Sequence, residues 1–162
     1  MAVFLSTYEM KVDRKGRVSV PAPFRTVLAK QSSEGTASGL VIFRSLQFST
    51  LEACSPEHME KLAADLETMD LPPEERDRIE MTIFGDSIHL TLDPEGRILL
   101  PQQLLDHANI AETAAFVGRS KIFQIWSPEA LKSHANEARV QSKASGISLS
   151  SITSAGRRRA VE

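Results

Sequence analysis

The chain has 162 residues and a formal net charge of −2, with 41% hydrophobic and 25% charged residues, an ordinary composition for a globular protein of one domain or two small ones. It contains no apolar run of the ~20 residues that a membrane-spanning helix needs and no N-terminal signal-peptide pattern. Its single cysteine, Cys54, excludes an internal disulfide and a cysteine-rich metal site, so we expect a cytoplasmic protein.

The first predicted element is a β-hairpin followed by a short helix. Residues 8–12 alternate between apolar and charged side chains, which is the period of a half-buried strand. A turn over 13–17 contains a glycine, and residues 18–20 return as a second short strand. Pro21 ends that strand because proline has no N–H for a ladder hydrogen bond. Apolar residues at 24, 27 and 28 predict the helix.

The next segment begins with a loop. Residues 31–39 are rich in glycine and serine, which favours a flexible connection. We predict strands over 40–43 and 46–51. Ser55 is the expected N-cap of a helix, because proline and glutamate follow it. The apolar stripe of that helix runs to Met69 and predicts a packing face.

An internal repeat organises these elements. The segment 13–21 recurs 80 residues later as 93–101, with the shared pattern Asp-x-x-Gly-Arg-apolar-x-apolar-Pro. The second copy therefore predicts strands over 88–92 and 98–100 and a short helix over 104–108. Further strand segments are predicted at 116–117 and 122–126, and Ser127 matches the first N-cap.

The repeat sets the predicted domain organisation. A unit of roughly 50–60 residues is marginal as an independent fold, so the two copies should pack as pseudo-symmetric halves that share strands. Both hairpin turns would then project from a common face. We expect an α+β fold made of a first repeat over 5–72, a linking helix over 73–86, a second repeat over 87–138 and a mobile basic tail over 139–162.

Basic side chains gather near the N-terminus. The first 25 residues carry five basic and two acidic side chains, and the last 27 carry five and two. A local basic patch can bind phosphate even when the whole protein is acidic. A solvated surface is the alternative for both segments.

The repeated turn resembles the Asp-x-x-x-Arg signature of the MraZ family, tandem relatives of the AbrB swapped-hairpin transcription factors. The resemblance covers about residues 3–135. Further matching segments are Phe24-Arg25, Glu75-Arg76, 116–118 and 123–126. The chain departs from the family pattern where Asp106 follows Leu105, since the family often has arginine there.

The resemblance implies two tandem AbrB-like swapped-hairpin repeats that form a pseudo-two-fold, β-barrel-like core with flanking helices. It also implies a DNA-binding transcriptional regulator of the bacterial division and cell-wall operon, which binds short direct repeats in its own promoter. Such proteins assemble into closed rings and associate with the nucleoid. The implied partners are double-stranded DNA and further copies of the chain, without a cofactor, a metal, a membrane or a small-molecule substrate.

The first turn supplies the main candidate DNA contact. The planar fork of Arg17 matches guanine O6 and N7 in the major groove, so Arg17 is the candidate for a base contact or a clamped phosphate. Asp13 should orient Arg17, and Gly16 should form the bend. The candidate phosphate contacts, which position the protein without reading sequence, are Arg14, Lys15 and Arg25.

The second turn carries two acids and one base, so it should repel phosphate. We expect Arg97 to contribute less to DNA binding than Arg17, with Asp93 and Gly96 in structural roles. For both Asp/Arg pairs the alternative is an ion pair that only stabilises the turn.

Other classes of function find less support. The four histidines are scattered without metal-ligand spacing, and no phosphate loop or nucleophile motif is present, so we predict no catalytic residue. A ring-shaped scaffold would use the arginines for subunit contacts. An antitoxin-like regulator is a further alternative, although the two full copies and the lack of a partner-binding extension count against it.

Overall fold

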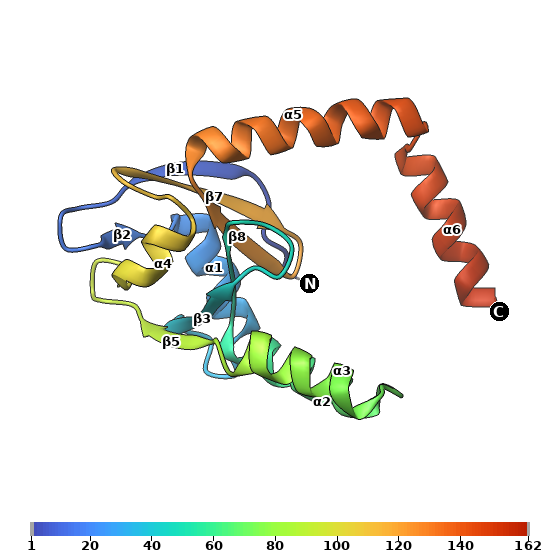
Figure 1. Cartoon of the computed structure of the whole chain (residues 1–162), viewed down its shortest axis with the longest axis horizontal. Helices are drawn as coiled ribbons and strands as arrows, with labels where there is room; N and C mark the ends of the chain where they lie inside the picture. Colours follow the sequence, from blue (N-terminus) through green and yellow to red (C-terminus); the bar gives the residue numbers. More distant parts are fainter. Residues whose placement is uncertain (1, 162) are drawn as a thin grey trace. The chain divides into compact units, whose positions relative to one another are not determined.

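The computed structural model describes residues 2–161 and divides the chain into two units, one ending at Pro128 and one starting at Glu129. Figure 1 shows the elements in chain order. The first repeat comprises β1 (Thr7–Lys11), β2 (Arg17–Ser19), α1 (Ala22–Gln31), β3 (Gly39–Arg44), β4 (Leu51–Cys54) and α2 (Pro56–Thr68). The connection consists of α3 (Pro73–Ile79) and the π-helical turn η1 (Glu80–Phe84). The second repeat comprises β5 (Ile88–Thr91), β6 (Arg97–Leu99), α4 (Gln102–His107), β7 (Thr113–Arg119) and β8 (Ile122–Trp126).

The two repeats share one antiparallel sheet. Its strand order is β1-β7-β8-β4-β3-β5. Replacing each strand by its counterpart in the other repeat gives the same order read backwards, so the two repeats are related by pseudo-two-fold symmetry in the sheet. The outer strand of each repeat pairs with the third strand of the other, so that Tyr8 lies opposite Phe116 and Leu90 lies opposite Leu40. The strand sharing predicted from the repeat is therefore present.

The predicted β-barrel-like core is wrong, because the sheet is open over the described residues. β2 and β6 form a separate two-stranded ribbon, and the bridge between Val12 and Val18 links that ribbon to the end of β1. Each ribbon strand is three residues long. Pro21 and Pro101 follow soon after and cannot extend the ladder, so the ribbon is too short to close the sheet.

The core of the first unit is an aromatic cluster from both repeats. The ring of Phe24, on α1, lies 5.3 Å from Phe4 and 5.0 Å from Phe123. These three rings and Phe116 are fully buried, and burial of each such side chain stabilises the fold by about 1.5–3 kcal/mol. The cluster explains why a short helix such as α1 is held firmly against the sheet.

Local differences from the sequence predictions have simple causes. The strand predicted over 46–51 is wrong, because residues 46–50 form bends and β4 starts only at Leu51. The Ser45 hydroxyl accepts hydrogen bonds from the backbone N–H groups of Gln47 and Phe48, which stabilises the loop. The predicted N-cap is confirmed, since Ser55 Oγ accepts from the His58 N–H at 3.0 Å.

Two helices form the second unit, α5 (Pro128–Ser145) and α6 (Leu149–Val161). They occupy most of the segment for which the sequence predicted a tail, and none of their residues is buried. Within residues 2–161, no helix has both the length and the apolar character needed to cross a membrane.

Candidate nucleic-acid interface

The first hairpin turn is built around the carboxylate of Asp13. Its Oδ1 accepts hydrogen bonds at 2.9 Å from the backbone N–H groups of Lys15 and Arg17. Its Oδ2 accepts from Arg17 Nε at 2.6 Å. These bonds, first among them the one from the Arg17 N–H, hold the pKa of Asp13 below its usual value. The charged carboxylate therefore tethers the Arg17 side chain.

Gly16 is required at the bend. Its φ is +88°, a conformation that side-chain-bearing residues rarely adopt. A Cβ at this position would lie 2.7 Å from the carbonyl oxygen of Leu100, and the Leu100 N–H donates to the Gly16 carbonyl at 2.9 Å. The first turn therefore packs against the second repeat at Gly16.

The second turn repeats this network and adds one bond. Asp93 accepts from the Arg97 N–H and from Arg97 Nε, both at 2.8 Å. Arg97 Nη2 also donates to Glu95 Oε2 at 2.6 Å. The contact with Asp93 raises the pKa of Arg97, and Glu95 acts in the same direction. Two carboxylates thus hold Arg97, whereas one holds Arg17.

The first turn is accessible on the single chain. The side chain of Arg17 is 39% exposed, compared with 32% for Arg97. Arg14 and Lys15 are exposed beside it.

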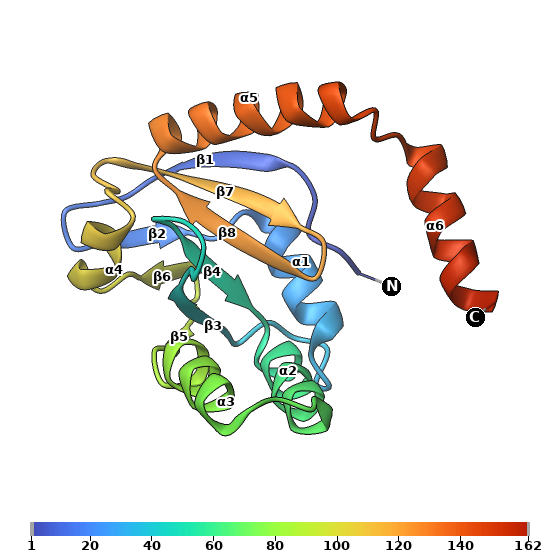
Figure 2. The same cartoon turned by 45° about the vertical axis from the view of Figure 1, so that its right-hand side comes forward.

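The acidic side chains gather elsewhere on the chain. Residues 57–80 carry nine acidic and three basic side chains. Figures 1 and 2 both place the helices of this acidic segment, α2 and α3, away from the first turn.

Arg25 lies at the second turn. Its Nη1 is 3.4 Å from the carbonyl oxygen of Glu95. The counterpart of Arg25 in the second repeat is Leu105, 80 residues later, and Leu105 lies against Gly16. Spacing within one repeat does not indicate this crossing, because it depends on how the two repeats pack together.

Comparison with known proteins gives concordant matches. The family model described as "MraZ protein, putative antitoxin-like" matches residues 3–71 and 83–145. A protein of Rickettsia rickettsii named "Transcriptional regulator MraZ" is 46% identical over 138 residues, 85% of this chain and 90% of that protein. Proteins of the same name from Rickettsia akari and Rickettsia typhi are 45% and 46% identical, covering 85% and 80% of this chain and 90% and 84% of theirs.

Proposed function

The chain belongs to the MraZ family, and from this membership we propose that it is a transcriptional regulator that binds double-stranded DNA through its hairpin turns. The observation that carries the proposal is the exposed first turn, in which Asp13 holds Arg17 by its Nε edge. A tethered guanidinium loses less side-chain entropy when it binds a ligand. Its terminal nitrogens stay available for a guanine edge or a phosphate.

The remaining basic residues take positioning roles in this proposal. Arg14 and Lys15 contact phosphates on either side of Arg17, which fixes the register without reading sequence. Arg97 and Arg25 lie at the second turn, where Arg97 donates to the carboxylate of Glu95 and Arg25 donates to its backbone carbonyl. The second turn therefore contributes less affinity than the first.

One such turn per subunit gives low affinity, so the proposal includes assembly. Copies of the chain form a closed homo-oligomeric ring, and several turns then engage short direct repeats in the promoter of the chain's own division and cell-wall operon. The pairing of β2 with β6 across the repeats supports the AbrB-like swapped-hairpin arrangement. We infer a cytoplasmic, nucleoid-associated protein.

Selection of bound sites from random duplexes by the purified full chain tests the proposal. We expect enrichment of one short box repeated in the same direction at a fixed spacing. An Arg17→Ala variant should lose the enrichment while light scattering shows an unchanged assembly. A selection that enriches no common box would contradict sequence-specific binding.

A further inference from the structure

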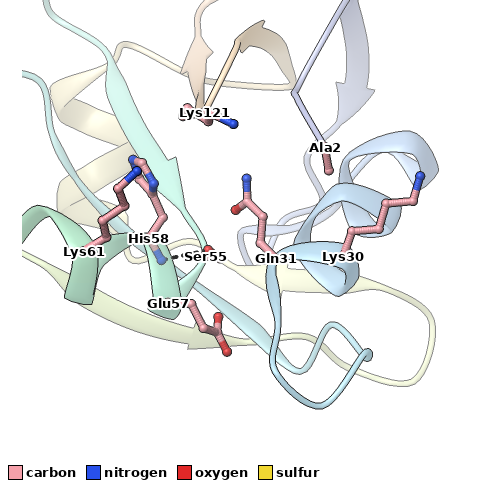
Figure 3. Close-up of a pocket in the computed structure, with 8 residues that line it drawn as sticks. All are labelled: Ala2, Lys30, Gln31, Ser55, Glu57, His58, Lys61 and Lys121. Atoms are coloured by element: carbon pink, nitrogen blue, oxygen red, sulfur yellow. Dashed lines mark hydrogen bonds between the residues drawn. The ribbon is translucent and has the colours of Figure 1, made fainter.

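A hollow of about 620 Å³ opens at the start of α2, next to the end of α1 and the β7–β8 connection. Figure 3 shows the side chains that line it. In Figures 1 and 2 the β7–β8 connection and the first hairpin turn lie at opposite ends of the sheet. The hollow is therefore separate from the proposed DNA contacts.

Lysines from three separate elements line the hollow, and Figure 3 shows the amine of Lys30 on the opposite side from those of Lys61 and Lys121. Lys30 is on α1, Lys61 is on α2, and Lys121 is in the β7–β8 connection. None of the ion pairs found among residues 2–161 involves these lysines. The lining includes the single carboxylate of Glu57, which in Figure 3 points to the side opposite Lys121. The charged side chains of the lining thus sum to about +2 at neutral pH.

His58 belongs to the lining of the hollow and lies close to two of its lysines. Its pKa lies below the usual value, first because the ring is partly buried and then because Lys61 and Lys121 are close. Asp65 acts in the opposite direction without cancelling them. The net positive charge of the lining favours a negatively charged occupant, and binding of one should raise the pKa of His58.

We propose that this hollow binds a small molecule carrying a diphosphate or two phosphate groups. Lysine ammonium groups bind phosphate as point charges. The lining has three lysines and one carboxylate, so it can balance additional negative charge from a ligand. The hollow has room for more than one phosphate ion, which is why the proposal names a phosphorylated small molecule.

Nuclear magnetic resonance of the histidine rings in the full-length assembly tests this site, with pyrophosphate and ADP as probes. Either probe should raise the pKa of His58, while the ring of His89, outside the hollow, is the internal control. The matched variants Lys61→Gln and Lys121→Gln should each weaken probe binding roughly fivefold, as expected for loss of one exposed charge contact. Glu57→Gln should tighten it by a similar factor.

Several outcomes would overturn the inference. No change at His58 with either probe, or equal binding by the lysine variants, would remove the site. A changed mass of the lysine variants in light scattering would indicate a contact between copies of the chain instead. A duplex that raises the pKa of His58 in a lysine-dependent manner would assign the hollow to the DNA surface. Arg17→Ala should keep probe binding, which separates this inference from the proposed function.

Discussion

Arg25 of the first repeat lies over Gly96 of the second, so the short helix of one repeat covers the hairpin turn of the other. At the equivalent place on the first turn, Leu105 lies against Gly16. An arginine and a leucine at equivalent positions make the two turns chemically unequal, although their backbone networks match.

Arg17→Ala should reduce promoter affinity more than Arg97→Ala. Loss of a bidentate guanidinium contact costs ~1–3 kcal/mol for each engaged turn, roughly fivefold to 150-fold. Arg97 is held by Asp93 and Glu95 together, so its removal should cost less. Gel-shift titration of the two variants measures the difference. Equal losses would show that the second turn binds as strongly as the first.

Glu95→Gln should increase DNA affinity by a few fold. The change removes one acidic group from the second turn and loosens the hold on Arg97, whose Nη2 donates to Glu95 at 2.6 Å. The Glu95 side chain is 69% exposed, so stability should hardly change. Fluorescence anisotropy with a labelled promoter duplex measures the affinity, and Glu129→Gln on α5 is the matched control. An unchanged affinity would place the second turn outside the interface.

Gly16→Ala and Gly96→Ala should both destabilise the fold, each by about 1–3 kcal/mol, because both glycines have positive φ. Their steric components differ. A Cβ at Gly96 would overlap the Arg25 guanidinium, which is a flexible group, whereas at Gly16 it would meet a backbone carbonyl. Arg25→Ala should therefore rescue part of the Gly96→Ala loss and none of the Gly16→Ala loss. A double-mutant cycle from urea unfolding measures this, and equal rescue of both would contradict the crossed contacts.

The local elements of this fold and the sharing of strands between the repeats were predictable, but the particular strand pairs were not. Alternation over residues 8–12 and the proline after each ribbon strand indicated the hairpins, and the serine–proline pair indicated α2. The pairing of Val18 with Ile98 joins residues 80 positions apart. The alternation of apolar and polar residues does not say which strands pair, because any two half-buried strands of equal length show the same alternation.

The candidate site shows the same division. The Asp13–Arg17 tether lies within five residues, so spacing alone indicated it. The position of Arg25 depends on which repeat covers which turn, and that follows only from three-dimensional packing. The open sheet depends on the lengths of the ribbon strands, and the bends at 46–50 depend on hydrogen bonds within the loop. Neither can be predicted from the hydrophobic pattern.

Asp13→Asn should lower the melting temperature at neutral pH, and the deficit should disappear in acid. The pKa of Asp13 is lower in the folded chain than in the unfolded one, so its contribution is present above the unfolded pKa of about 3.9 and is lost as the pH falls through the folded value. The same sign holds for Asp93. Melting curves of the variant and wild type between pH 7 and 2.5 measure the effect. A deficit that persists at the lowest pH would mean that the charge of Asp13 is unimportant.

DNA affinity should fall steeply with salt, and Lys15→Gln should make the fall less steep. Each phosphate contact releases condensed counterions, so removing one lowers the slope of log affinity against log salt by about 1 for each engaged turn. Lys15 is exposed and outside every ion pair found among the described residues, which makes it free to contact phosphate. Arg17→Lys is the informative comparison, because lysine keeps the charge but loses the planar fork. That variant should retain the salt slope and lose discrimination between promoter and random duplex. A salt-independent complex, or a slope unchanged by Lys15→Gln, would place the phosphate contacts elsewhere on the chain.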